Sequence, residues 1–319
     1  MSSIEIVSAS PSELRHALRL SLIGRGRTGS EVERNVTAFL EYARAMSLDA
    51  GPQWFCRADG RAISACTAVE SSGRSAILLL GVPDDRPGFL DGQVQLIERA
   101  AACLAERGNR LIQALIEVDD GFNRRALERA GFLDIAILEY LELKMISAPL
   151  RAAALPPPEY RQASLTWLDY GEKTHPRFAD LIRATYEDSR DCPGLSDLRE
   201  IEDVIAGHKA TGRFSPHRWH LLLIEDVPAA CILLSENPLR PVLELVYMGV
   251  HPRFRGRGLG RYILDKGLEW ASAERFHTVT LAVDARNAPA RDLYRLAGFV
   301  RATSRRALVR PVVLTSIEP

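Results

Sequence analysis

The sequence predicts an α/β (α+β) protein built from two tandem domains, and three observations support this. Apolar runs of strand length alternate with amphipathic runs of helix length along 319 residues, more chain than one ordinary core needs. A strand ending in Gly-Val and a later helix closed by Ala-Gly-Phe occur twice, from Val82 to Phe132 and from Val250 to Phe299. A segment with three consecutive prolines lies between the copies.

The first predicted domain covers residues 1–147. Ser10-Pro11 marks the start of a helix, and Asp59-Gly60 between two apolar runs is a hairpin signal. The expected strands are 4–8, 54–57, 62–69, 75–82, 111–118 and 135–145. The first expected helix ends near residue 23, and the others cover 32–43, 93–107 and 123–130. Residues 148–158 are expected to be a semi-rigid linker, because proline has no N–H group for a helix or a central strand.

The second predicted domain covers residues 159–319 and follows a similar order. The expected strands are 160–167, 219–225, 229–235, 242–250, 279–284 and 302–314, and the expected helices are 176–189, 197–209, 262–273 and 289–296. Aligning the two Ala-Gly-Phe ends gives an offset of 167 positions, from Phe132 to Phe299, so the copies can be compared residue by residue. The chain is therefore interpreted as a tandem duplication.

Composition restricts the possible functions. The chain has 46% hydrophobic and 26% charged residues, as soluble globular proteins do, and its 41 basic and 41 acidic residues cancel. A general nucleic-acid binder usually has a basic excess, so none is expected as a partner. Five scattered cysteines, no signal peptide and no apolar run long enough for a membrane span favour a reduced, cytoplasmic protein, monomeric or homodimeric.

The stretch His251–Arg261 follows an apolar strand and opens a helical run. Its glycines allow close backbone approach to a ligand, and the helix N-terminus adds about half a positive charge. Four arginines, at 253, 255, 257 and 261, are expected to add whole charges. The spacing matches neither the dinucleotide fingerprint nor the nucleotide P-loop. The stretch is either a phosphate-binding loop or a surface turn rich in Gly and Arg.

The spacing Arg255-x-x-Gly258-x-Gly260 resembles the pyrophosphate loop of the GCN5-related N-acetyltransferases (GNATs). Asn287 after the next strand and Tyr294 on the next helix match the same pattern. The resemblance implies two GNAT-like domains, each a mixed, mostly antiparallel sheet flanked by helices. It also implies acetyl-CoA as co-substrate, without a metal, contacted by Met248, Gly249, Val250, Arg255, Gly256, Arg257, Gly258, Leu259, Gly260, Arg261, Asn287 and Tyr294.

A carboxylate in the apolar strand 242–250 is costly unless it has a task or a partner, so Glu244 is a candidate general base. Strand alternation predicts that it shares a face with Met248 and Val250. By resemblance, a bulge in this strand exposes the N–H of Met248 or a neighbour to the thioester oxygen, and Tyr294 protonates the leaving thiolate. The alternatives are an ion pair of Glu244 with Arg218 or Arg240, and a packed core role for Tyr294.

The first copy is expected to be degenerate and non-catalytic. At the offset of 167, Asp120 replaces Asn287 and Leu127 replaces Tyr294. The counterpart of the glycine loop has gained prolines and three acids, Asp84, Asp85 and Asp91. Carboxylates repel a pyrophosphate, and proline removes N–H donors.

The stretch 186–194 brings acids close to an aromatic residue before a Pro-Gly turn. Tyr186, Asp188 and Asp191 could form an anionic pocket for a small amine, or only a solvated helix end. The histidines have no metal-ligand spacing, and surface or capping roles are expected for them. The leading hypothesis is an acetyl-CoA-dependent N-acetyltransferase acting on a primary amine by direct attack in a ternary complex. A non-catalytic acyl-CoA-binding or sensing protein and an acyltransferase for protein N-termini are the alternatives.

Overall fold

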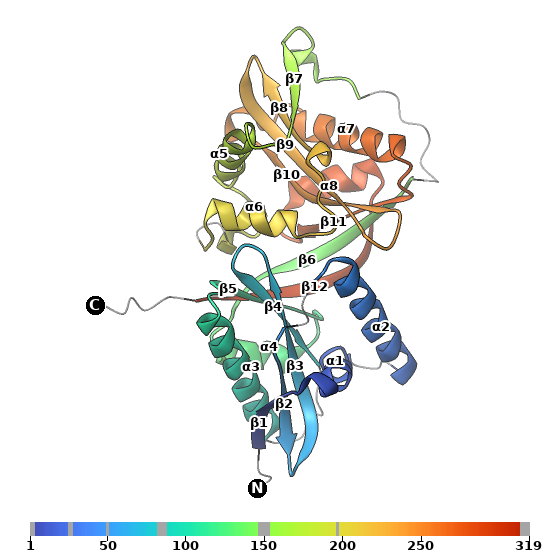
Figure 1. The fold of residues 1–319 in the computed structure, drawn as a ribbon. Helices are drawn as coiled ribbons and strands as arrows, with labels where there is room; N and C mark the ends of the chain where they lie inside the picture. Colours follow the sequence, from blue (N-terminus) through green and yellow to red (C-terminus); the bar gives the residue numbers. More distant parts are fainter. Residues whose placement is uncertain are drawn as a thin grey trace, which may run out of the picture. The chain divides into compact units, whose positions relative to one another are not determined.

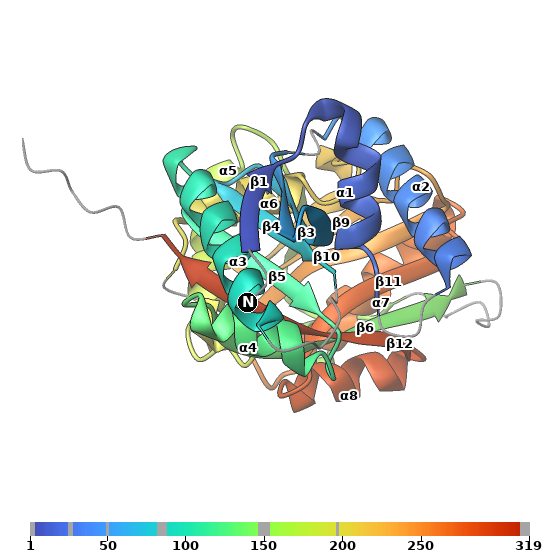
Figure 2. The same ribbon diagram turned by 90° about the horizontal axis from the view of Figure 1, so that it is seen from below.

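The computed structural model describes residues 4–24, 28–48, 51–81, 88–145, 154–195 and 198–312. The chain divides into two compact units, which Figures 1 and 2 show as ribbons. The first unit combines Met1–Ala136 with Arg305–Pro319, and the second is Ile137–Ser304. Within the described residues, no helix is both long and apolar enough to cross a membrane.

The first unit has a mostly antiparallel sheet in the order β1-β2-β3-β4-β5-β12, with β4 and β5 parallel. Helices α3 and α4 cover one face, and α1, with α2 packed against it, covers the other (Figure 2). The elements are β1 (Ile4–Ser8), α1 (Leu14–Ser21), α2 (Gly29–Ala45), β2 (Gln53–Ala58), β3 (Arg61–Ser71), β4 (Ser75–Leu80), α3 (Phe89–Glu106), β5 (Leu111–Ile116), α4 (Gly121–Arg129) and β12 (Val300–Pro311).

The second unit repeats this plan, with the order β6-β11-β10-β9-β8-β7 and with β10 and β11 parallel. Helices α7 and α8 pack on one face and α5 and α6 on the other (Figure 1). The elements are β6 (Leu133–Lys144), β7 (Leu165–Asp169), α5 (His175–Thr185), α6 (Ile201–Lys209), β8 (Trp219–Ile224), β9 (Val227–Glu236), β10 (Val242–Val250), α7 (Leu259–Ala273), β11 (Thr278–Asp284) and α8 (Ala288–Ala297).

Short 3-10 turns complete the description at Pro11–Glu13, Pro158–Tyr160, Pro193–Leu195, Pro216–Arg218 and Pro252–Phe254. The fold class predicted from the sequence is confirmed. The predicted hairpin at Asp59-Gly60 is present, with φ of 51° and 78° as a type I′ turn requires. The strand expected at 160–167 begins only at Leu165, because Tyr160 belongs to a 3-10 turn.

The compact units depart from the predicted division at 148–158. Strand β6 lies before the linker in sequence, yet it pairs with β11, from Leu138↔Asp284 to Lys144↔Thr278. Strand β12 ends the chain's second half, yet it pairs with β5, from Arg306↔Ile116 to Pro311↔Leu111. Alternation identifies a strand but not its partner, so the sequence did not reveal this exchange. Residues 148–153 of the predicted linker lie outside the described residues.

The duplication is visible in the backbone. Helices α3 and α7 both begin after a left-handed glycine, Gly88 at φ 89° and Gly258 at φ 82°. Helices α4 and α8 have N-cap residues of nearly the same conformation, Asp120 at φ −74°, ψ 73° and Asn287 at φ −81°, ψ 70°. The starts of these helices are therefore equivalent in the backbones of the two units.

Candidate active site

Strand β10 carries an irregularity that opens the second unit's sheet. Its register with β9 shifts between Leu245 and Tyr247, which is a β-bulge around Val246. Its parallel pairing with β11 ends at Leu245↔Leu281, although β11 continues to Asp284. The two strands therefore separate beyond this point, and the bulge that the GNAT resemblance implied is present.

A cavity of about 630 Å³ occupies this opening. It is lined by the end of α5 with the turn that follows, by β10, by the glycine loop with the start of α7, and by β11 with α8. Most of the predicted site residues meet here: Tyr186, Asp188, Asp191, Met248, Gly249, Val250, Arg255, Gly256, Gly258, Leu259, Gly260, Asn287 and Tyr294. Glu244, Arg257 and Arg261 are not part of this lining.

The glycine loop presents backbone donors to the cavity. Gly256 and Gly258 have φ of 74° and 82°, a left-handed region that other residues enter only with strain. Tyr262 makes the first intrahelical bond of α7, to the carbonyl of Gly258 at 3.2 Å. The N–H groups of the preceding first turn have no intrahelical acceptor, so they and the helix dipole form an anion site.

The expectation of four charges added to the anion site holds only in part, because Arg257 and Arg261 have acidic partners while Arg255 keeps its charge beside the cavity. Arg255 donates to the carbonyls of Val250, Thr185 and Glu187 at 3.1, 2.8 and 2.7 Å, and so ties the loop to the C-terminal end of α5. Arg257 pairs with Glu159 at 2.9 Å, and Arg261 with Asp265 at 2.6 Å. Arg253 is exposed, with its guanidinium 5.6 Å from the Phe254 ring centre.

Tyr294 lines the cavity from α8 and also packs in the core, 7% exposed and 5.7 Å from the Phe299 ring. Burial raises its pKa above the ordinary value, and the nearby Asp191 charge adds to this effect. The phenol is therefore protonated at neutral pH and can act as a proton donor toward the cavity.

Glu244 does not lie where alternation predicted. Leu243 and Leu245 pack in the cluster with α7 and α8, so Glu244 between them faces α5 and α6. After the bulge, Met248 and Val250 are on the α7 side. The prediction that Glu244 shares their face is therefore wrong, because the extra residue of the bulge reverses the alternation.

Burial raises the pKa of Glu244. Within the described residues it makes no ion pair, and Arg218, one suggested partner, pairs instead with Glu236 and Glu274. A half-buried carboxylate without a counter-charge is a candidate for acid–base work.

The acidic turn after α5 folds back onto the end of β11. Asp191 accepts the Asp284 N–H at 3.1 Å, and the Cys192 N–H donates to the Asp284 carboxylate at 3.2 Å. Burial of its carboxylate raises the pKa of Asp191, with a smaller contribution from the Asp284 charge, although the residue as a whole stays exposed. Burial also raises the pKa of Tyr186 to about 12.

Two residues near the cavity were not identified from the sequence as belonging to the site. The Tyr247 hydroxyl is 2.5 Å from the Thr185 hydroxyl, and the His208 ring lies 5.2 Å from the Tyr247 ring. Burial, with help from the Arg199 charge, lowers the pKa of His208 to about 4, and its Nε2 atom is buried, so the expected surface role is wrong. The only sequence signal for Tyr247 was its place in the strand where the GNAT resemblance implied a bulge.

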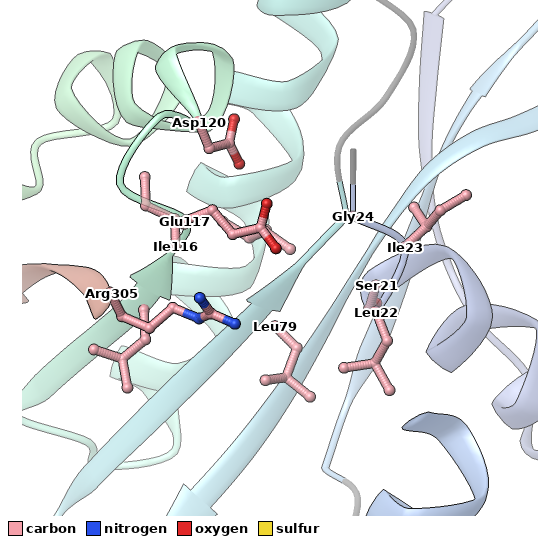
Figure 3. A pocket seen from close by; sticks show the side chains of 11 residues that line it. Ser21, Leu22, Ile23, Gly24, Leu79, Ile116, Glu117, Asp120 and Arg305 are labelled. Atoms are coloured by element: carbon pink, nitrogen blue, oxygen red, sulfur yellow. The ribbon is translucent and has the colours of Figure 1, made fainter. Parts of the chain in front are cut away.

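The first unit has a smaller pocket of about 160 Å³ at the equivalent place, between the end of α1, β4 and the end of β5. Figure 3 shows Glu117, Asp120 and Arg305 in it. Fully buried Asn123 donates to the Asp120 carboxylate at 2.8 Å and to the Gly81 carbonyl at 2.9 Å. Its carbonyl accepts from Gln93 at 2.7 Å. These bonds join α3, α4 and the end of β4.

Comparisons with known proteins agree with this geometry. Residues 177–299 match the Acetyltransferase (GNAT) family. A GCN5-related N-acetyltransferase from Sphaerobacter thermophilus has a similar fold, with TM-score 0.61 and 15% identity over 97% of this chain and 95% of that one. A tandem GNAT protein from the clavulanic acid biosynthesis pathway has TM-score 0.50 and 13% identity over 97% and 98% of the two chains. Residues 177–299 therefore form a GNAT-family domain, and together with the sequence relatives given next they identify an N-acetyltransferase.

Within this family the tandem architecture resembles that of mycothiol synthase, and two sequence relatives agree with this. The mycothiol acetyltransferase of Paenarthrobacter aurescens is 26% identical over 246 residues, 73% of this chain and 69% of that protein. The mycothiol acetyltransferase of Clavibacter michiganensis is 29% identical over 255 residues, 70% and 79% of the two chains. The predicted family and enzyme class are confirmed.

The raised pKa of Glu244 predicts a pH-dependent stability difference. A folded-state pKa above the ordinary 4.5 means that the charged form destabilises the fold, so stability is highest at low pH and falls as pH rises through the folded value. Glu244→Gln should therefore raise the free energy of unfolding at pH 7 and leave it nearly unchanged near pH 4. Urea unfolding at both pH values measures this. Exposed Glu98→Gln is the control, and a Glu244→Gln variant less stable at pH 7 would contradict the assignment.

Proposed function

We propose that the protein transfers the acetyl group of acetyl-CoA to the primary amine of a small molecule by direct attack in a ternary complex. The observation that carries this proposal is one cavity that contains an anion-binding helix start, a protonated tyrosine and an acidic turn. The first element suits a diphosphate, the second a leaving thiolate and the third an amine.

Acetyl-CoA binding is assigned to the second unit. The unpaired N–H groups at the start of α7 and the left-handed glycines fit a diphosphate without steric obstruction at Gly256. Backbone groups of Met248, Gly249 and Val250 face the region where β10 has left β11, so they can bond an extended amide-bearing arm. Asn287 and Tyr294 line the far wall of the same cavity.

The reaction is assigned to three groups of the chain. Glu244 removes a proton from the attacking nitrogen. It acts through a water molecule, because its carboxylate lies on the α5 side of β10 and does not line the cavity. The N–H of Met248 or a neighbour stabilises the charge on the carbonyl oxygen. Tyr294 donates its proton to the sulfur as the carbon–sulfur bond breaks and the carbon–nitrogen bond forms.

The acceptor is assigned to the acidic turn. Asp188 and Asp191 place carboxylates beside the cavity, with Tyr186 as an aromatic wall. This favours a cationic amine over an anionic acceptor. Because two relatives are named mycothiol acetyltransferases, an amine related to mycothiol is the first acceptor to test.

The first half of the sequence is proposed to be non-catalytic. Asn123 occupies with a buried amide the position that Ala290 leaves open in the second unit, where Ala290 lines the cavity. Its bond to the Gly81 carbonyl joins α4 to the end of β4 across the place where the acyl carrier would enter. The counterpart of the glycine loop, 82–87, lies outside the described residues.

Replacing Tyr294 tests the acid. Tyr294→Phe keeps the buried ring and removes only the proton donor, so kcat should fall about 100-fold, within the usual range for acid–base groups. Acetyl-CoA affinity by calorimetry should stay within about twofold, because the hydroxyl contributes to the transition state more than to binding. A variant with full kcat would remove Tyr294 from this role.

Release of free CoA on adding amines to the wild type separates an enzyme from an acyl-CoA-binding sensor.

The pH dependence of kcat/KM distinguishes the roles proposed for Glu244 and Asp191. If Glu244 is the base, kcat/KM rises with pH as it loses its proton, and Glu244→Gln should abolish this rise and lower the rate at least 100-fold. Asp191→Asn should keep the rise but increase KM for the amine about 10-fold, since it loses one charged hydrogen bond. If the rise of kcat/KM with pH disappears in Asp191→Asn and persists in Glu244→Gln, Asp191 is the base and Glu244 is not.

The stoichiometry of binding tests the assignment to one unit. Titration calorimetry should give one acetyl-CoA per chain. Gly258→Asp, which strains a left-handed position against Pro157 and adds a carboxylate next to the anion site, should abolish that binding. A second equivalent, or one equivalent remaining in Gly258→Asp, would show that the first unit also binds acetyl-CoA.

A further inference from the structure

The segment that joins the two halves of the sequence is packed against the glycine loop. The Pro157 ring lies 3.3 Å from the position that a Cβ on Gly258 would occupy, so it covers one side of the residue that caps the start of α7. Two residues further on, the Glu159 carboxylate pairs with Arg257 at 2.9 Å. The Tyr160 N–H donates to the Pro157 carbonyl at 2.8 Å and closes this stretch into a turn.

The same segment is anchored on both sides of these contacts. Tyr160 is 5% exposed and lies in one apolar cluster with the loop residue Phe254 and with Leu259 and Tyr262 of α7. The Tyr160 and Phe254 rings meet edge to face at 6.4 Å. At the other end, the Ala154 N–H donates to the Glu269 carboxylate on α7. Residues 154–160 are therefore fixed on the loop and its helix, and are not a free spacer.

We infer that this segment, 154–160, is a positioning element of the diphosphate site and that Glu159 controls its charge. The inference rests on the proposed function. Pro157 limits the movement of Gly258, whose conformation directs the first N–H groups of α7. The Arg257 guanidinium is paired with Glu159 and does not line the cavity, whose lining includes Gly256 and Gly258. The other two prolines of the run have no such contact with a loop glycine.

The two parts of the inference predict opposite effects on binding. Pro157→Gly removes the packing on Gly258 and loosens the loop, so acetyl-CoA should bind about 3- to 10-fold more weakly, because the loop must then be ordered on binding. Glu159→Gln breaks a half-exposed ion pair and removes a carboxylate near the anion site. It should tighten acetyl-CoA binding about 2- to 5-fold and steepen its salt dependence, because Arg257 is then available to the diphosphate.

The experiment measures dissociation constants of the full chain for acetyl-CoA and for S-acetylpantetheine, which lacks the diphosphate. Both variants should change the first constant and leave the second within about twofold of wild type. Leu155→Ala is the matched control, because this side chain in the same segment is 71% exposed. It should bind both ligands as the wild type does.

The outcomes separate this inference from the proposed function. If the wild type binds acetyl-CoA and both variants bind it equally well, the segment has no positioning role. Equal weakening for both ligands, with a lowered melting temperature, would reduce it to a structural role and overturn the inference. If the wild type binds neither ligand, the proposed function fails, and the inference fails with it. Should Pro157→Gly fail to fold, Glu159→Gln alone decides the matter.

Discussion

The site depends on one constraint, the loss of strand pairing after Leu245. Because β10 leaves β11 there while staying paired to β9, a backbone edge is exposed inside the sheet, where hydrogen-bonding groups are normally satisfied. The start of α7, Asn287, Tyr294 and the acidic turn are all placed around that opening. An unbroken ladder would leave the same side chains without a cavity to line. The bulge is thus the feature on which binding and chemistry both rest.

The first unit lacks this bulge, because β4 pairs with β3 without a register shift from Cys66↔Leu80 to Ser71↔Ser75. Its backbone keeps the left-handed glycine before α3 and the N-cap before α4. The chain of bonds from Ser64 through Gln93 and Asn123 to the Gly81 carbonyl then joins the elements around the cleft. A buried polar network is stable only when each member has its partners, so it favours the closed arrangement. In the second unit, Ala290 offers no such bridge.

Much of this could be predicted from the sequence, because its signals are local. The glycine loop, the duplicated Ala-Gly-Phe ends and Tyr294 follow from spacing and residue type within one segment. The exchanged strands β6 and β12 could not be predicted, since pairing partners are set by packing across the whole chain. The face of Glu244 was predicted wrongly because one bulged residue reverses alternation. The partners of Arg255 and Arg257 could not be foreseen, because Glu159, Thr185 and Glu187 are distant from them in sequence.

Charge placement explains how one cavity can serve two unlike ligands. The glycine loop attracts the anion through the N–H groups of α7 and the Arg255 guanidinium, which donates to backbone carbonyls and keeps its charge. Arg257 is paired with Glu159 and does not line the cavity. The acidic turn contributes Asp188 and Asp191 to another part of the same lining. Because the helix dipole falls off within a turn and exposed charges are screened by salt over about 10 Å, each ligand is attracted mainly by the groups nearest to it.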